Sequence, residues 1–230
     1  MTDTYSHTRH RLEEYFDRTA SQTWERLTSD APVSRIRQTV REGRDRMRAA
    51  LLYRLPRSLN GARVLDAGCG AGQMAVELAA RGAEVVAVDI SASLLEVAAR
   101  RTPDHLAGRI DYRAGDMLDA RLGSFDHVVA MDSLIHYAPD DVVQALAGLA
   151  HRTRKSLHFT IAPRTPLLSA MHVAGKLFPR SDRSPAIQPV SERRLRRDCA
   201  ADPALTRWRV PTGERIKSGF YISQAMRLIR

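Results

Sequence analysis

The chain is poor in cysteine and has no long apolar run. Its 230 residues include only two cysteines, Cys69 and Cys199, so no disulfide framework is expected and a reducing compartment, the cytoplasm, is predicted. No stretch approaches the roughly 18–20 apolar residues that a membrane-spanning helix needs. The residues from Met1 to Glu14 are mostly polar and do not resemble a secretory signal peptide. A secreted or membrane-embedded protein is therefore not expected.

Aromatic residues and metal-ligand patterns are also scarce. Phe, Trp and Tyr make up 6% of the chain, and no Cys/His spacing typical of zinc is present, so no metal site is predicted. The net charge is +10, but the arginines are dispersed and not interleaved with aromatics, which argues against a nucleic-acid surface. Such a charge is also compatible with an acidic small molecule or an anionic membrane surface.

The most informative segment is a glycine-rich loop that follows a short apolar run. Residues 63–72 have the sequence Arg-Val-Leu-Asp-Ala-Gly-Cys-Gly-Ala-Gly, and an apolar helical pattern follows them. This order predicts a buried parallel strand ending at Asp66, then a tight turn and a helix. A second strand, 84–88, precedes Asp89 and Ile90. An acidic residue in that position can accept hydrogen bonds from the ribose hydroxyls of an adenosine ligand.

The glycine spacing distinguishes between two kinds of nucleotide site. The dinucleotide fingerprint has glycine at its first, third and sixth positions, whereas the sixth residue counted from Gly68 is Gln73. The observed order, Asp-x-Gly-Cys-Gly-x-Gly, instead resembles motif I of the class I S-adenosylmethionine-dependent methyltransferases. The resemblance implies that Asp66 offsets the α-ammonium group of adenosylmethionine. The residues that it places around this cosubstrate are Asp66, Gly68, Cys69, Gly70, Asp89 and Ile90.

Two further strands precede candidate site residues. Asp116 and Met117 follow the third predicted strand, and we expect them to contact the amine and the ring of adenine. The strand 125–131 ends at Met131, and the loop after it contains His136. Because ligands of open α/β sheets bind beyond the carboxyl ends of the strands, Met131 is predicted at the cosubstrate and His136 where the methyl group is transferred.

The alternation of strands and helices predicts an α/β fold of the Rossmann-like class I methyltransferase type, with a seven-stranded, mostly parallel sheet and one antiparallel strand. The remaining strands are expected at 110–114, 155–163, 207–210 and 219–222, the last one antiparallel. Residues 1–56 are predicted to form a helical arm or cap, and residues 57–230 the methyltransferase domain. An apolar insertion at about 164–190 is expected to cover the active site.

Two residues of the N-terminal arm are candidates for the site. Tyr15 lies in an aromatic stretch with no core strand to belong to, so we expect it to close over the cosubstrate. Arg41 lies on a predicted helix from 35 to 55, from which its guanidinium could reach the carboxylate of adenosylmethionine. The alternative for Arg41 is a solvated surface position.

Several segments outside these motifs resemble one family. They are the aromatic residues of 15–24, the Arg-Glu-Gly of 41–43, 128–137 (Val-Val-Ala-Met-Asp-Ser-Leu-Ile-His-Tyr), 162–168, 175–186 (Gly-Lys-Leu-Phe-Pro-Arg-Ser-Asp-Arg-Ser-Pro-Ala) and 219–223. Over nearly the whole chain they resemble the magnesium-protoporphyrin O-methyltransferases of chlorophyll and bacteriochlorophyll synthesis. The resemblance implies transfer of the methyl group of adenosylmethionine to a propionate carboxylate of magnesium protoporphyrin IX, which gives the monomethyl ester.

The same resemblance implies roles for residues and partners. It makes His136 and Tyr15 the catalytic residues: His136 orients or deprotonates the propionate, or contacts the porphyrin magnesium, and Tyr15 positions the same group. Arg164, Arg180 and Arg183 are expected to hold the propionates. A magnesium chelatase subunit is a candidate partner. The expected location is the cytoplasm, with peripheral contact to the inner or photosynthetic membrane.

Three alternative functions stay open from the sequence. The chain could methylate another small acidic molecule, it could methylate RNA, or it could be a porphyrin carrier that has lost turnover. The carrier is disfavoured because the acids Asp66 and Asp89 and the glycines between them are intact.

Overall fold

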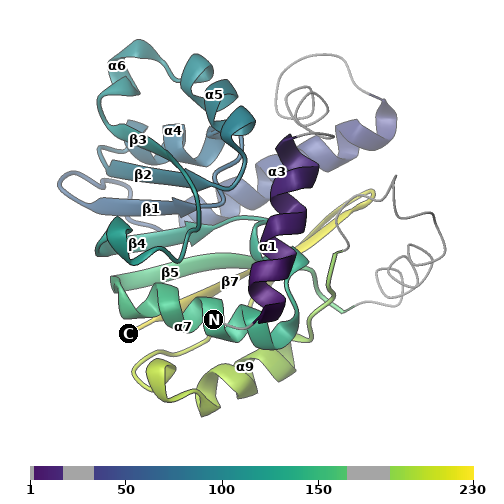
Figure 1. The fold of residues 1–230 in the computed structure, drawn as a ribbon. Helices are drawn as coiled ribbons and strands as arrows, with labels where there is room; N and C mark the ends of the chain where they lie inside the picture. Colours follow the sequence, from purple (N-terminus) through teal and green to yellow (C-terminus); the bar gives the residue numbers. More distant parts are fainter. Residues whose placement is uncertain (1–2, 18–33, 165–186) are drawn as a thin grey trace.

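The computed structural model describes residues 3–17, 34–164 and 187–230, which are built around one seven-stranded sheet (Figure 1). The strands are β1 (Arg63–Ala67), β2 (Glu84–Asp89), β3 (Ile110–Ala114), β4 (Phe125–Ala130), β5 (Thr153–Ile161), β6 (Glu214–Ser218) and β7 (Tyr221–Ile229). Their spatial order is β3-β2-β1-β4-β5-β7-β6. β7 runs antiparallel to both of its neighbours, and the other pairs are parallel. The predicted mostly parallel sheet with one antiparallel strand is confirmed.

The helices begin where the sequence supplies caps. They are α1 (Asp3–Tyr15), α3 (Arg35–Tyr53), α4 (Gln73–Ala80), α5 (Ala92–Arg101), α6 (Asp104–Ala107), α7 (Pro139–His151) and α9 (Glu192–Ala201), with short 3₁₀ turns η2 (Ala120–Leu122), η3 (Leu134–His136) and η5 (Pro203–Leu205). The hydroxyl oxygens of Ser34, Ser91 and Ser191 accept hydrogen bonds from backbone N–H groups in the first turns of α3, α5 and α9. Each serine thus satisfies a donor that has no partner within its helix.

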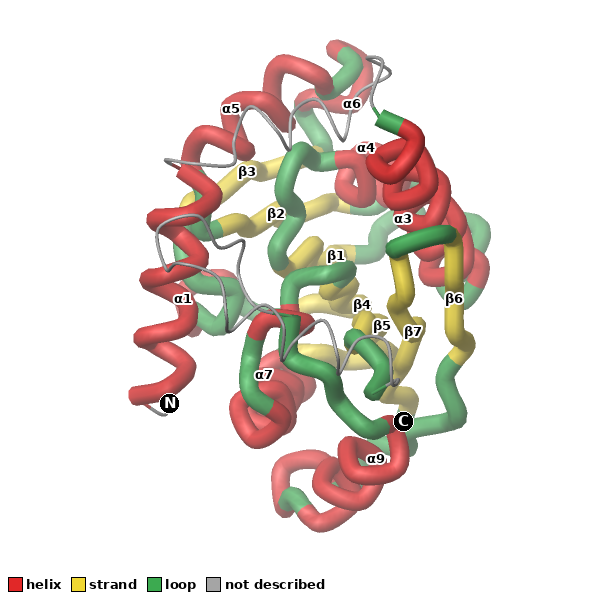
Figure 2. The backbone as a smooth tube through the Cα atoms, turned by 90° about the vertical axis from the view of Figure 1, so that its right-hand side faces the viewer, coloured by secondary structure: helices red, strands yellow, loops and turns green. Residues whose placement is uncertain are grey.

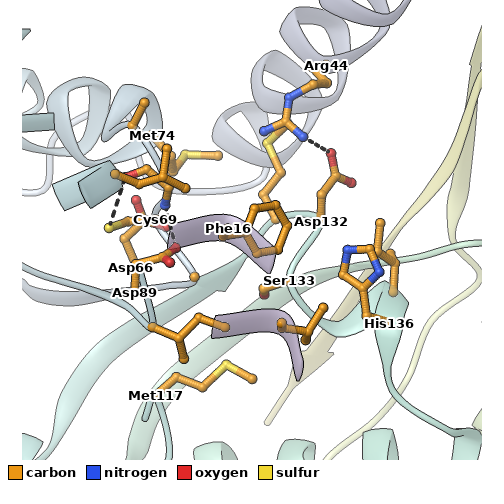
Figure 3. A pocket seen from close by; sticks show the side chains of 18 of the residues that line it. Phe16, Arg44, Asp66, Cys69, Met74, Asp89, Met117, Asp132, Ser133 and His136 are labelled. Atoms are coloured by element: carbon orange, nitrogen blue, oxygen red, sulfur yellow. Dashed lines mark hydrogen bonds and ion pairs between the residues drawn. The ribbon is translucent and has the colours of Figure 1, made fainter. Parts of the chain in front are cut away.

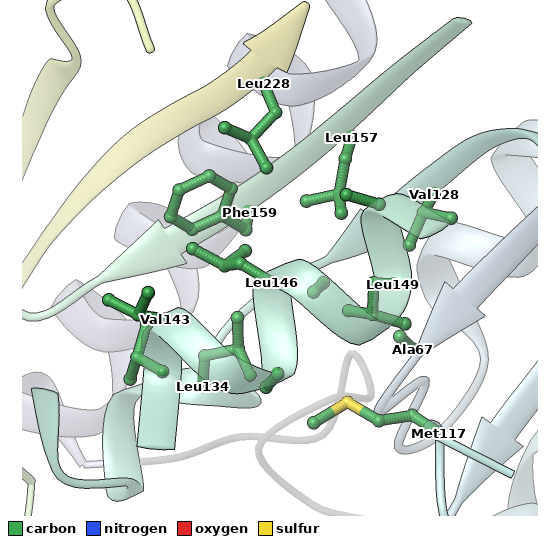
Figure 4. Close-up of a cluster of buried hydrophobic side chains, with 14 of the residues drawn as sticks. Ala67, Met117, Val128, Leu134, Val143, Leu146, Leu149, Leu157, Phe159 and Leu228 are labelled. Carbon is green, nitrogen blue, oxygen red and sulfur yellow. The ribbon is translucent and has the colours of Figure 1, made fainter. Parts of the chain in front are cut away.

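Successive residues of the central strands point to opposite faces of the sheet, and both faces are apolar. On β1, Val64 packs in the cluster formed with α3 and α4, whereas Leu65 packs in the cluster formed with α7 and α9. Figure 4 shows the second cluster, in which Leu146 of α7 lies beside Phe159 of β5 and below Leu228 of β7. α3 also covers β6 and β7. The sheet is therefore the middle layer of three.

The strand order creates a crevice at the carboxyl ends of β1 and β4. From β1 the chain moves outward through β2 to β3 and then returns to β4, on the other side of β1. The loops that follow β1 and β4 diverge there, and Figure 2 is viewed towards this edge of the sheet. The two loops nevertheless meet closely, since a Cβ on Gly68 would lie 2.3 Å from Cβ of Ser133. Glycine at position 68 is therefore required both by its φ of 82° and by this contact.

The prediction of the last two strands was partly wrong. Residues 207–210 are not a strand: only Arg209 pairs with the sheet, through an isolated bridge to Ile229 at the end of β7. Pro211 has no N–H to continue that pairing, and the buried side chain of Trp208 packs in the apolar core. The actual sixth strand is 214–218, and the antiparallel last strand extends from 221 to 229, beyond the predicted end at 222.

Parts of the predicted arm and cover lie outside the described residues. These parts are residues 18–33 of the arm and residues 165–186 of the insertion. The two ends of the insertion lie together, because Val190 pairs with Pro163 and its N–H donates to the carbonyl oxygen of Ala162. The division of the chain at residue 56 stays a prediction. None of the described helices is both long and apolar enough to cross a membrane.

The contact between α3 and β7 yields a stability prediction. A Cβ on Gly43 would lie 2.5–2.8 Å from three carbon atoms of Tyr221, so Gly43→Ala forces the helix away from the strand. We expect the clash to lower the free energy of unfolding by about 1–3 kcal/mol. The higher helix propensity of alanine offsets roughly 1 kcal/mol of this loss. The control is Gly148→Ala in α7, where the nearest atom lies 3.6 Å away and a gain is expected. Urea unfolding of both variants measures the change in the free energy of unfolding. Equal changes in the two variants would contradict the predicted clash at Gly43.

Candidate active site

A cavity of about 360 Å³ lies beyond the carboxyl ends of β1, β2 and β4 (Figure 3). Its described lining has two ends. The glycine-loop end carries Asp66, Asp89 and Met117, which appear on the left of Figure 3. The α3 end carries Arg44 and His136, on the right, together with the first residues of β7. The chemistry of each end follows from the loops that form it.

Asp89 holds the glycine loop in place. Its carboxylate oxygens accept hydrogen bonds from the N–H of Gly70 at 2.7 Å and from the N–H of Ser91 at 2.9 Å. Burial raises the pKa of Asp89, and these N–H donors oppose that shift. The N–H groups of Gly68 and Cys69 both donate to the carbonyl oxygen of Val88. The end of β2 therefore fixes the loop after β1, and a carboxylate lies where a ribose would be bound.

Asp66 is a buried acid with unused hydrogen-bonding capacity. It accepts a hydrogen bond from the backbone N–H of Ala75, but its Oδ2 has no hydrogen-bond partner among the described residues. Burial, followed by the charge of Asp89, raises the pKa of Asp66 to about 7. A buried carboxylate oxygen without a partner is costly unless a ligand pairs with it. This end of the cavity therefore fits a cationic group such as the α-ammonium of adenosylmethionine.

Helix α1 closes the cavity beside Asp116. Oδ1 of Asp116 accepts hydrogen bonds from the Tyr5 hydroxyl and from the N–H of Leu118, each at 2.9 Å. The Tyr5 ring stacks on Tyr137, with 4.7 Å between centroids, and burial raises the pKa of both hydroxyls. Tyr5 was not predicted, because a lone tyrosine in a polar N-terminal helix carries no signal of its long-range partner. Asp116 and Met117 line the cavity, and their contact with adenine stays a prediction.

The end of α1 reaches across the cavity to α5. Tyr15 and Phe16 line the cavity with their rings edge to face at 5.3 Å, and Phe16 lies 6.3 Å from the ring of His136. Oδ1 of the next residue, Asp17, accepts hydrogen bonds from the hydroxyls of Ser91 at 2.7 Å and Ser93 at 3.1 Å. The two predicted catalytic residues, Tyr15 and His136, thus share one cavity.

Asp132 joins β4, β5, β7 and α3 at the other end. Its carboxylate lies 2.8 Å from Nη1 of Arg44 and accepts hydrogen bonds from the hydroxyls of Tyr221 at 3.1 Å and Thr160 at 3.1 Å. The side chains of Asp132 and Arg44 are 6% and 19% exposed, so this ion pair is largely desolvated. Asp132 also has a φ of 56°, a strained conformation for a residue with a Cβ. It directs the chain into η3, which carries His136.

All of the residues predicted to be catalytic or to bind the cosubstrate line this cavity except Arg41. On α3 it is Val40, Arg44 and Arg48 that contribute to the lining. Residues four apart share one helix face, and Arg41 is turned by about 100° from Val40, so the helical period could have selected Arg44. Arg164 is exposed and outside the lining, and Arg180 and Arg183 lie outside the described residues.

The fold and this site define the class of protein. An acid near the end of β1, a glycine turn, a helix, and a second acid at the end of β2 are the parts of a class I S-adenosylmethionine-dependent methyltransferase. In agreement, the family model for a methyltransferase domain matches residues 64–156, and the model for the magnesium-protoporphyrin IX methyltransferase C-terminus matches residues 130–230.

Comparison with known proteins identifies the family. The chain is 50% identical to the magnesium-protoporphyrin O-methyltransferase of Rhodobacter capsulatus over 98% of both chains. It is 30% identical to the enzyme of that name from Synechocystis, over 73% of this chain and 74% of the other. The crystal structure of magnesium protoporphyrin IX methyltransferase from Synechocystis PCC 6803 with bound SAH superimposes with a TM-score of 0.80, at 26% identity, over 96% and 99% of the chains. The chain belongs to the magnesium-protoporphyrin O-methyltransferase family.

The raised pKa of Asp66 predicts proton release on binding of adenosylmethionine. Because that pKa is about 7 in the free protein, the carboxyl is partly protonated at neutral pH, and a neighbouring cation lowers the pKa. Affinity should therefore rise as the pH increases through about 7. Calorimetry in two buffers of different ionisation enthalpy measures the protons released. Asp66→Asn cannot titrate, so it should release none and bind about 1–3 kcal/mol more weakly. Equal proton release by both proteins would contradict this role.

The ion pair between Arg44 and Asp132 predicts coupled losses of stability. Asp132→Asn or Arg44→Gln leaves one largely buried charge without its partner, which should lower the free energy of unfolding by about 2–4 kcal/mol. Asparagine tolerates the left-handed backbone at position 132, so strain is unchanged in that variant. The double variant should lose much less than the sum of the two single losses. Denaturant unfolding of the four proteins tests this, and strictly additive losses would exclude the coupling.

Proposed function

We propose that this chain transfers the methyl group of S-adenosylmethionine to a propionate carboxylate of magnesium protoporphyrin IX and forms the monomethyl ester. The observation that carries the proposal is that one cavity is lined by Asp66, which has an unpartnered carboxylate oxygen, and by His136 and Tyr15. The 50% identity to the Rhodobacter capsulatus enzyme over nearly the full length of both chains supports the same acceptor.

The glycine-loop end suits the cosubstrate. Asp66 would pair with the ammonium group, Asp89 would accept from the ribose hydroxyls, and Met117 would pack on the adenine ring. The open backbone at Gly70, where an added Cβ would meet nothing within 4 Å, leaves room for a close approach of the ligand. When bound, adenosylmethionine supplies an electrophilic methyl carbon on a positively charged sulfur.

The acceptor needs positioning more than activation. A propionate has a pKa near the about 4.3 of a glutamate side chain, so it is ionised at neutral pH and is already a nucleophile. One of its oxygens bonds to the methyl carbon while the carbon–sulfur bond breaks and the sulfur keeps the electron pair. His136 would donate a hydrogen bond that orients the carboxylate, or accept its proton if burial has raised the acceptor's pKa. Tyr15 and Phe16 close this region against water.

The proposal also includes contact with a membrane and with a partner protein. A net charge of +10 supports peripheral contact with an anionic membrane from the cytoplasmic side. A magnesium chelatase subunit is proposed as a partner because the acceptor is hydrophobic and direct transfer between proteins would keep it out of water. The membrane contact is tested by liposome binding, which should be lost at high salt. The partner is tested by co-purification of the chelatase subunit with this chain.

The proposed reaction predicts a selective loss of turnover in two variants. His136→Ala and Tyr15→Phe should lower kcat with magnesium protoporphyrin IX and leave the affinity for adenosylmethionine nearly unchanged, because both residues act on the acceptor. If His136 contributes one hydrogen bond, the loss is about ten- to a hundredfold. If it is an obligatory base, the loss is about 10²–10⁴-fold, and the activity of the wild type, which retains the histidine, falls at low pH.

The assay uses radiolabelled adenosylmethionine and extraction of the porphyrin ester, with RNA as the competing acceptor. The Tyr15→Phe variant retains the ring, so its defect reports on the hydroxyl alone. Label in RNA and none in the porphyrin would overturn the proposed function. Wild-type rates in both variants would instead show that these residues are not at the reacting centre.

A further inference from the structure

Exposed apolar side chains gather around the mouth of the cavity. Among the described residues the large hydrophobic side chains that are clearly exposed are Ile36 (55%), Tyr53 (87%), Ile187 (38%) and Phe220 (55%). Ile187 and Phe220 line the cavity, and Ile36 lies one helical turn before Val40, which also lines it. Only Tyr53 in this group lies elsewhere, at the far end of α3. A cluster of apolar side chains exposed to water typically marks a site that a ligand or partner covers.

The position of Phe220 is fixed by the rigid turn between β6 and β7. Gly219 has a φ of 54°, and a Cβ there would lie 2.3 Å from Oγ1 of Thr39, so the turn abuts the first turns of α3. On the other side, the hydroxyl of Tyr221 donates to Asp132. The backbone around Phe220 is thus held from both sides while its ring stays half exposed. An aromatic presented in this way is a preorganised contact surface.

The charges on the lining select the kind of ligand that would cover this surface. The described lining has only two arginines, Arg44 and Arg48, and both belong to α3 at the same end as Phe220. Asp66, Asp89 and Asp116 line the opposite end. Asp132 lines the α3 end as well and pairs with Arg44. Arg48 lies 2.8 Å from Asp45, so this end is close to neutral whereas the opposite end is acidic. A largely apolar ligand whose acidic groups stay away from the three carboxylates therefore suits the α3 end. A planar aromatic body would gain most from a fixed phenyl ring, through offset stacking.

The size of the cavity requires such a ligand to protrude. About 360 Å³ is near the lower limit for a site that encloses one drug-sized molecule, so a nucleoside cosubstrate and a tetrapyrrole macrocycle do not both fit inside. We propose that Phe220, flanked by Ile36 and Ile187, is the platform on which the macrocycle of the acceptor packs outside the cavity, while one propionate enters towards His136. This inference rests on the proposed function and adds to it the residues that bind the acceptor.

The test removes the ring from the platform. Phe220→Ala should raise the KM for magnesium protoporphyrin IX about ten- to a hundredfold, which corresponds to ~1.4–2.8 kcal/mol, with the KM for adenosylmethionine unchanged. Phe220→Trp retains a flat ring and should restore a KM within a few fold of the wild type. The matched control is Tyr53→Ala, which removes another exposed aromatic of the same chain and should change neither KM. Because Phe220 is half exposed, its truncation should leave the melting temperature nearly unchanged.

A binding measurement separates this inference from the proposed function. Quenching of porphyrin fluorescence on titration with protein reports binding of magnesium protoporphyrin IX whether or not methyl transfer occurs. If the wild type binds the porphyrin but does not methylate it, the proposed function fails, and a weaker affinity of Phe220→Ala still supports the platform. Wild-type affinity and KM in Phe220→Ala overturn the platform. The platform is also overturned if Phe220→Ala loses only its binding to anionic liposomes, because the ring would then contact a membrane and not the porphyrin.

Discussion

The buried carboxylate of Asp132 is the contact on which the two walls of the active site depend. It lies at the carboxyl end of β4 and receives Arg44 from α3, Tyr221 from β7 and Thr160 from β5. An ion pair that is so largely removed from water is stable only when further hydrogen bonds complete it, and here β5 and β7 supply them. The left-handed backbone of Asp132 then turns the chain into the segment that carries His136. One carboxylate therefore fixes both the α3 wall and the position of the histidine.

The glycine-loop end of the cavity contains acidic side chains whose hydrogen-bonding capacity is only partly used. Asp89 is committed to the N–H groups of Gly70 and Ser91, but Asp66 keeps one oxygen without a partner among the described residues. The charge of the nearby Asp89 makes ionisation of Asp66 unfavourable. A cation bound between them relieves this repulsion. Under the proposed pairing of Asp66 with the cosubstrate's ammonium group, this cost would be recovered on binding. The site is thus shaped for its ligand by electrostatics as well as by the glycine turn.

Helix α1 links the two ends. Tyr5 contacts Asp116 and Tyr137 near the start of the helix, and Asp17 contacts Ser91 and Ser93 beyond its end. Between these anchors, Tyr15 and Phe16 lie over the region between the glycine loop and His136. A helix held at both ends presents its aromatic residues at a fixed height above the strand ends. The proposed approach of the acceptor is from the side of α3 and the β6–β7 turn, where the exposed Phe220 lies.

Local patterns in the sequence determined the strand that carries Asp66 near its end, the glycine turn, and the caps at Ser91 and Ser191, because each depends on neighbours in the chain. They also determined that His136 follows the central strand, since the strand ends of a parallel sheet share one edge. The tertiary structure alone decided which side chains meet across that edge. Arg44 rather than Arg41 reaches Asp132 through the rotation of α3 on β7, and Tyr5 finds Asp116 from 111 residues away. Residues 207–210 alternate charged and apolar side chains as a strand does, yet only Arg209 pairs with the sheet and Pro211 ends the pairing. Such outcomes depend on packing between distant segments, and no local pattern encodes that packing.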